Sequence, residues 1–433
     1  MTGSAVKKAD RVPLGNPTRQ TSCGLGSAPL CPPGLPVCSA AVTTRTAQVT
    51  TVLLASFVQG LVGSAFAASA SVLRARGLSD AQYGSLFVPL VVLAALGAAG
   101  GGFVVERIGA KRALALGFAF MALSQAALAA TPFVATALAY PVALLGTSLL
   151  GLGAGVSAGP LNAYPQVLFP SRSESAVVAL HATVGIGLAL TPLMAGAALA
   201  RGAWLAVPLL LFLASAALLV AVEREDLPEP EARGEARSRP IGDTLLRLFL
   251  AIAFLYGVAE SVYGNWAVLH LTEERGLDVA AAGLALAAFW AAVTVGRFAV
   301  AALVLHVPPA RVLPVLAALM AGACLLVPLS TTPRRAVVLY ALGGLGCSAV
   351  FPLALALAGR RFPEQRSWVS SAMYATLCAG IGVGSFSAGV LRSGLDLGTI
   401  YRLAALPPTV AAFLALRAIA IPEPPERGER RQT

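Results

Sequence analysis

Twelve long apolar stretches follow one another along this chain of 433 residues. A helix needs roughly 20 apolar residues to cross the hydrocarbon core of a bilayer. Backbone polar groups in that core must be paired within the segment, so we expect each stretch to be a helix. Charged residues make up only 12% of the chain, about half of what a soluble protein carries. The sequence therefore predicts an all-α membrane protein in a lipid bilayer, with twelve transmembrane helices near 48–72, 80–104, 113–131, 136–166, 174–199, 203–222, 244–270, 278–304, 310–330, 336–358, 367–391 and 399–421.

The positive charges indicate how these helices are oriented. Cytoplasmic loops of membrane proteins carry an excess of Lys and Arg. With both termini in the cytoplasm, 23 of the 31 Lys and Arg residues lie on that side and eight on the other. The net charge of +11 then follows from the topology, and we expect no nucleic-acid partner. We predict a multi-pass monomer of the cytoplasmic (inner) membrane with both termini cytoplasmic. The eight outer residues are Arg74, Arg76, Arg201, Arg275, Arg334, Arg335, Arg392 and Arg402.

The longest polar joint, residues 223–243, divides the chain into two sets of six spans. We predict a disordered cytoplasmic tail over 1–45, six-helix bundles over 46–222 and 244–421, a cytoplasmic linker over 223–243 and a cytoplasmic tail over 422–433. Aligning Phe169 with Phe362, an offset of 193, matches 28 residues without a gap and with eight identities. This indicates a duplication, so the two bundles should be pseudo-symmetric. A parallel repeat of six-helix halves is a transporter architecture.

The joint after the second span carries a motif of glycines, one acid and several bases. It resembles the signature loop of the major facilitator superfamily, with glutamate in place of the usual aspartate. In that family the loop forms a charge cluster that latches the two halves on the cytoplasmic side. The resemblance implies the same role for Gly102, Glu106, Arg107, Gly109, Lys111 and Arg112, and a simple basic cytoplasmic turn is the alternative.

Within the superfamily the chain resembles the fucose-permease-like group, which includes sugar–proton symporters. The resemblance rests on the segment from Gly151 to Pro192, on Tyr256 to Trp266, and on Phe289-Trp290 with Gly296-Arg297. The sugar symporters of the group use acidic residues in spans 1 and 4, and this chain has none in either span. Proton coupling has therefore moved to another residue, or the protein is not that kind of symporter.

Two ionisable residues lie near the middle of a span. Glu260 is the only one of twenty Asp and Glu to do so, and His181 is the only one of three His. A charge at membrane depth is costly and is usually functional. Burial favours the neutral form of a carboxyl group, which lets it exchange a proton near neutral pH. We predict Glu260 as the coupling or substrate carboxylate, with a permanently neutral or structurally paired carboxyl as the alternative.

Further polar and aromatic side chains could line a solute path, although packing and interhelical hydrogen bonds explain them equally well. His181 could bind substrate or relay protons, and Tyr374 occupies its repeat position. Arg297 ends the apolar core of span 8 on the cytoplasmic side, where it joins the latch or reaches toward the interface. The remaining candidate site residues are Gln59, Asn162, Asn265 and Trp266.

The sequence contains no nucleotide-binding Gly-rich loop, no metalloprotease motif and no clustered metal ligands. We therefore expect no enzymatic activity, no cofactor and no metal. The predicted function is secondary transport of a small polar solute, such as a sugar, by alternating access, with a proton gradient as the candidate driving force. The alternatives are an exporter of apolar drugs or metabolites, and a sensor built on a transporter fold.

Overall fold

The structure is a computed structural model that describes residues 36–229 and 242–421. The chain separates into two units, Met1–Thr44 and Arg45–Thr433, and the description below concerns the second. The predicted C-terminal tail, most of the N-terminal tail and the middle of the linker lie outside the described residues. Helix α1 begins at Pro36, inside the stretch predicted as the N-terminal tail. Alanines 40 and 41 follow within its first turns, and alanine favours helix more than any other residue.

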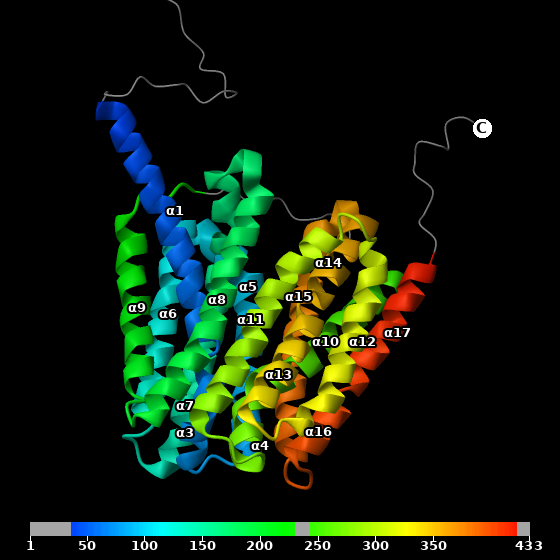
Figure 1. The fold of residues 1–433 in the computed structure, drawn as a ribbon. Coiled ribbons are helices and arrows are strands. Elements are labelled where there is room, and N and C mark those ends of the chain that lie inside the picture. The colour runs from blue at the N-terminus through cyan, green and yellow to red at the C-terminus, as the bar shows by residue number, and fades with distance from the viewer. Residues whose placement is uncertain (1–35, 230–241, 422–433) are drawn as a thin grey trace, which may run out of the picture. The chain divides into compact units, whose positions relative to one another are not determined.

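Every regular element in the described part of the chain is helical (Figure 1). Twelve segments there are long and apolar enough to cross a membrane, as the sequence predicted. The elements of the first half are α1 (Pro36–Gly63), α2 (Ala65–Ala68), α3 (Ala70–Ala75), α4 (Asp80–Ser85), α5 (Phe87–Ile108), α6 (Ala110–Ala130), α7 (Thr136–Leu168), η1 (Pro170–Arg172), α8 (Ser173–Ala200) and α9 (Ala206–Arg224). Those of the second half are α10 (Thr244–Leu269), η2 (His270–Glu274), α11 (Val279–Leu303), α12 (Pro309–Leu326), η3 (Val327–Leu329), α13 (Pro333–Cys347), α14 (Val350–Arg361), η4 (Pro363–Gln365), α15 (Arg366–Leu391), α16 (Leu397–Leu403) and α17 (Leu406–Ala420).

The two halves repeat one another at the offset found in the sequence. The short helices η1 and η4 both begin at the proline of a Phe-Pro pair, and their bounds differ by 193 residues. The next helices, α8 and α15, begin 193 residues apart as well. Phe169 and Phe362 even share their backbone conformation, with φ of −133° and −125°. The structure therefore contains two pseudo-symmetric six-helix bundles.

Proline leaves backbone carbonyls free at several points in the membrane-spanning helices. A proline has no N–H, so the carbonyl four residues before it loses its helical partner. Side chains from other helices supply the missing donors. The hydroxyl of Ser64 donates to the carbonyl of Leu188 at 3.0 Å, four residues before Pro192. In the same way the Sγ atom of Cys324 lies 3.5 Å from the carbonyl of Ala404, four residues before Pro408, and Arg297 reaches Ser348, four residues before Pro352.

Glycines allow the helices of the two halves to touch. A Cβ atom on Gly185 of α8 would collide with the side chain of Thr294 on α11. A Cβ on Gly382 of α15 would lie 2.8 Å from Val91 of α5. Small residues permit such close approach between membrane helices. These two helix pairs, α8 with α11 and α5 with α15, join the bundles.

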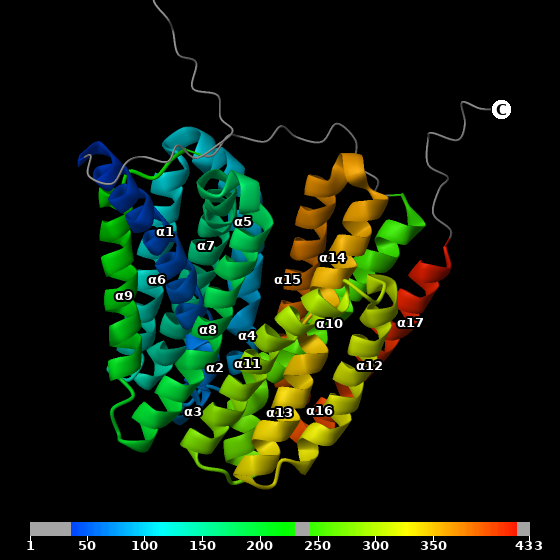
Figure 2. The same ribbon diagram turned by 45° about the horizontal axis from the view of Figure 1, so that its top comes forward.

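The contacts between the bundles are concentrated toward one end of the second unit. We name this the Glu273 end, and the opposite end, where α9 stops and α10 starts, the linker end. Ser385 of α15 meets Gly84 of α4, and Gly389 meets Asp80, close to the Glu273 end. From there the two groups of helices diverge toward the linker end in both views (Figures 1 and 2). Gly185 is the last of these glycine contacts before the helices separate.

Candidate functional site

The first half contributes a hydrogen-bonded pair of polar side chains at membrane depth. Asn162 on α7 and His181 on α8 approach to 3.1 Å between Oδ1 and Nε2. The amide Nδ2 of Asn162 also donates to the carbonyl of Ala158 at 2.8 Å. Both side chains are exposed, and His181 lies one helical turn from the Gly185 contact, on the linker-end side. The pair therefore stands where the two bundles begin to separate.

The second half contributes a carboxylate and a guanidinium to the same region. On α10 the hydroxyl of Tyr256 donates to Oε1 of Glu260 at 2.6 Å. On α11 the Nε atom of Arg297 donates to the carbonyl of Ser348 at 3.2 Å. Arg297 lies within electrostatic range of both Glu260 and His181. His181 and Arg297 each lie about one helical turn from the contact between Gly185 and Thr294, and we call Asn162, His181, Glu260 and Arg297 together the central polar cluster.

In the described structure Arg297 donates its hydrogen bond to Ser348, and its role in the latch stays a prediction. No ion pair of 4.0 Å or less joins it to Glu260 in the described structure. Each of the two charged groups has a neutral partner instead. The exposed Tyr374 of α15 lies beside Cys378, which interacts electrostatically with Glu260. Gln59 on α1 is half-buried.

Asn265 and Trp266 lie in the contact between the bundles near the Glu273 end. The Trp266 side chain is completely buried, and its Nε1 donates to the carbonyl of Ser385 at 3.3 Å. The amide of Asn265 donates to the hydroxyl of Ser385 at 2.7 Å. The hydroxyl of Tyr83 donates to the backbone carbonyl of Asn265 at 2.7 Å. The contacts with Tyr83 join the two bundles here, while the bonds to Ser385 lie within the second bundle, and the Trp266 ring is completely buried.

The signature loop joins α5 to α6 at the linker end. Gly109 has a φ of +84° and ends one helix as it starts the next, which explains the need for glycine. The guanidinium of Arg107 lies 4.4 Å from the ring of Phe103, while Gly102, Glu106 and Arg112 are exposed and Lys111 is half-buried. A linker residue that the sequence did not single out binds the loop. Glu229 accepts a hydrogen bond from the backbone N–H of Ala110 at 2.8 Å.

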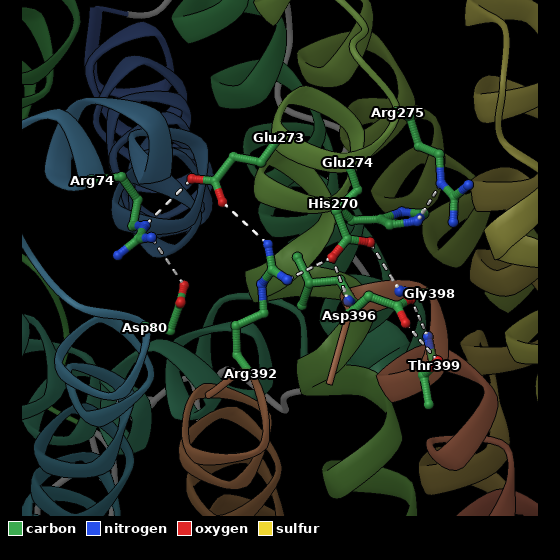
Figure 3. A network of polar contacts seen from close by, with 11 residues as sticks. Arg74, Asp80, His270, Glu273, Glu274, Arg275, Arg392, Asp396, Gly398 and Thr399 are labelled. Atoms are coloured by element: carbon green, nitrogen blue, oxygen red, sulfur yellow. Dashed lines mark hydrogen bonds and ion pairs between the residues drawn. The ribbon is translucent and has the colours of Figure 1, made fainter. Parts of the chain in front are cut away.

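A second charged group, which we call the ion-pair cluster, lies at the Glu273 end. Figure 3 shows Glu273 between Arg74 of the first half and Arg392 of the second, at 3.3 and 3.5 Å. Arg74 also pairs with Asp80 at 3.4 Å, and Arg392 with Glu274 at 2.8 Å. Glu274 in turn accepts hydrogen bonds from the first N–H groups of α16. The Arg74–Glu273 pair joins one bundle to the other. The five members of the ion-pair cluster are Arg74, Asp80, Glu273, Glu274 and Arg392.

A series of buried, hydrogen-bonded side chains lies next to the ion-pair cluster. The Nε atom of Arg275 donates to His270 at 3.1 Å, and the other ring nitrogen of His270 lies 3.1 Å from the hydroxyl of Tyr340. The hydroxyl of Tyr340 donates to that of Tyr401 at 2.9 Å, and Tyr401 donates to the carbonyl of Val262. Networks of this kind are rigid when every member is paired. The short π-helix that carries Glu273 is thereby held in place.

Comparison with known proteins shows which family the chain belongs to. The sequence description of the Major Facilitator Superfamily matches residues 49–251 and again 248–433. The chain belongs to the major facilitator superfamily. It is therefore a membrane carrier, as the signature loop indicated, and not an enzyme. No curated protein matches the chain.

Solved structures share the fold at low sequence identity. A D-xylose-proton symporter superposes with a TM-score of 0.74 at 13% identity, covering 88% of this chain and 98% of that one. The nucleoside transporter NupG gives 0.67 at 14%, covering 87% and 100%. The fucose:proton symporter FucP of E. coli gives 0.56 at 14%, covering 87% and 99%. The likeness to FucP extends to the fold, and the motif resemblance to its group stays a prediction.

Proposed function

We propose that this carrier moves a small polar solute together with a proton, and that the central polar cluster is its binding site. The observation that supports this proposal is that Arg297 on one bundle interacts electrostatically with Glu260 on its own bundle and with His181 on the other, where His181 is hydrogen-bonded to Asn162. Secondary transporters bind their substrates at such an interface of repeats near the midplane. Amide and imidazole groups suit the hydroxyl groups of a solute, and a carboxyl group at membrane depth suits a proton.

Alternating access assigns a role to each end of the protein. The excess of Lys and Arg makes the linker end the cytoplasmic side. The ion-pair cluster then closes the outer side while the central polar cluster is open to the cytoplasm. Outward opening breaks the Arg74–Glu273 pair, and the signature loop closes the inner side. Glu260 binds a proton on one side of the membrane and releases it on the other.

Replacing Glu260 with Gln tests the proton role. Wild-type protein in proteoliposomes should accumulate a labelled solute from a panel of monosaccharides, sugar acids and nucleosides when the interior is made alkaline. The E260Q variant keeps a hydrogen-bonding group for Tyr256 at 2.6 Å but cannot release a proton. It should lose accumulation driven by the pH gradient and retain exchange of solute between the two sides.

Asp278→Asn provides a matched control. Asp278 caps α11 through a bond to the N–H of Ala281, and asparagine caps a helix equally well. This variant should transport as the wild type does. Equal responses of wild type and E260Q to the pH gradient would refute the proton role of Glu260. Extrusion of apolar dyes without uptake of any polar solute would support the exporter alternative instead.

A further inference from the structure

The side chain of Arg297 is anchored through one nitrogen only. Its Nε donates to the carbonyl of Ser348, and the described residues provide it with no other hydrogen bond or ion pair. A guanidinium has five N–H donors in a planar fork. The terminal nitrogens of Arg297 are not among the buried polar atoms without a partner, so they remain accessible. A preformed fork with accessible donors therefore stands in the central polar cluster.

The anchor is a fixed feature of the fold. The carbonyl of Ser348 has no helical partner, because Pro352 has no N–H to donate to it. The helix is interrupted at this point, between the end of α13 and the start of α14. Gly296, next to Arg297, brings α11 so close that a Cβ atom there would lie 2.6 Å from the side chain of Ser348. The orientation of the guanidinium is thus set before any solute arrives, which reduces the cost of binding.

Arg297 interacts electrostatically with side chains of three helices. They are Glu260 and Tyr256 of α10, His181 of α8 and Cys347 of α13. Glu260 is the one carboxylate among them, and its hydrogen bond goes to Tyr256. When Glu260 binds a proton, the positive charge of Arg297 is left without an opposite charge nearby. A charge at membrane depth is costly unless it is paired, so an anion is the partner that the site then lacks.

From this we propose that the substrate carries a carboxylate, which binds Arg297, and hydroxyl groups, which bind Asn162 and His181. This inference rests on the proposed function and names its substrate class, a hydroxylated organic acid such as a sugar acid. Planar forks of donors match carboxylates in a bidentate manner. The protonation of Glu260 and the binding of the anion occur together. One proton and one negative charge cross the membrane in each cycle, and no net charge moves.

Proteoliposomes with matched pairs of labelled solutes test the proposal. Suitable pairs are galacturonate with galactose and xylonate with xylose. Uptake is measured with an imposed pH gradient, and separately with an imposed potassium diffusion potential. We expect the acid of a pair to enter at least about ten times faster than its neutral partner. The pH gradient should drive this uptake and the membrane potential should not.

Variants of Arg297 complete the test. Arg297→Gln should abolish the preference for the acid, and Arg297→Lys should retain part of it, because lysine keeps the charge and loses the fork. The exposed Arg201 donates to the carbonyl of Ala197 in its own helix, so Arg201→Gln is the matched control and should behave as wild type. A thermal-shift assay with the transported acid should show stabilisation of wild type and not of R297Q, which separates loss of binding from misfolding.

Two results would overturn the substrate class. One is faster transport of the neutral member of the pairs, driven by the membrane potential as well as by the pH gradient. That result would leave the proposed proton-coupled transport intact. The other is an undiminished preference for the acid in R297Q, which would place the anion site elsewhere. Failure of the proposed function itself would show as uptake that ignores the pH gradient.

Discussion

Replacing Glu273 with Gln should weaken the closure of the Glu273 end. Glu273 is the only carboxylate that pairs with arginines of both bundles, Arg74 at 3.3 Å and Arg392 at 3.5 Å, in the described structure. Neutralising it leaves the two arginines facing each other with one carboxylate fewer between them. The equilibrium between the closed and open forms of this end should shift toward the open form.

The structure sets the size of this shift. At 3.3 Å two unit charges attract by about 1 kcal/mol in water and by about 5 kcal/mol at an effective dielectric constant of 20. The side chains of Arg74 and Glu273 are 25% and 32% exposed, so solvent screens the pair toward the lower limit. Exposed pairs contribute about 0.2–1 kcal/mol each. Among the ion pairs of the described residues, only Arg74–Glu273 joins the two bundles, so its loss changes the ratio of open to closed protein by about 1.4- to 5-fold.

A cysteine buried in the closed end reports the opening. Ser385 is completely buried where α15 meets α4. In a background without the native cysteines, Ser385→Cys should react slowly with a membrane-impermeant maleimide. Adding Glu273→Gln should raise the labelling rate by the factor given above, because the rate follows the open population. High salt should raise the rate of the parent protein as well, since it screens exposed charges.

Two controls show whether the shift comes from the pairs. Arg201→Gln removes a charge at the same end whose hydrogen bond, among the described residues, goes to its own helix, and it should leave the labelling rate unchanged. The double variant Arg74→Gln with Glu273→Gln should raise the labelling rate by less than the two single effects combined, because both single changes break the same contact. A labelling rate in E273Q equal to that of the parent would show that the ion-pair cluster does not hold this end closed.

Two further changes test packing and capping. Gly185→Ala places a methyl group against Thr294 and should lower the free energy of unfolding by about 1–3 kcal/mol, which a thermal-unfolding assay in detergent detects. Gly159→Ala, where a Cβ meets open space, is the neutral control. Equal stability of the two variants would contradict the close contact. Glu229→Gln removes the negative charge that caps α6 at the N–H of Ala110 and should weaken that helix end by about 0.3–1 kcal/mol. Faster hydrogen exchange at Ala110 measures this, and unchanged exchange would refute the capping role.

The sequence was sufficient to predict the spans and the repeat, because both depend on local chemistry. Long apolar segments can only be helices in lipid, and the Phe-Pro pairs that align in the sequence begin η1 and η4 in the structure. Glu260 and His181 stood out for the same reason, since ionisable residues are rare at membrane depth. The structure adds that Arg297 interacts electrostatically with both of them.

Contacts between distant segments could not be predicted in this way. Arg74, Glu273 and Arg392 each sit at the end of a different span, and only the folded chain brings them together. Trp266 has an aromatic ring of the kind that stacks on sugars, but this ring is buried against the other bundle. Glu229 carried no signal beyond an acidic residue in a linker. In each case the deciding partner is more than a hundred residues away along the chain.

The meeting point of Gly185 and Thr294 divides α11 unequally. From Thr294 the helix extends for about 22 Å to Val279 but for about 14 Å to Leu303, at 1.5 Å a residue. If the bundles rock about this point, a turn of about 10° swings the Glu273 end by about 4 Å and the linker end by about 2.5 Å. The longer arm alone covers more than the 3.3 Å between Arg74 and Glu273. For the same turn the Glu273 end therefore opens about 1.6 times as far as the linker end closes.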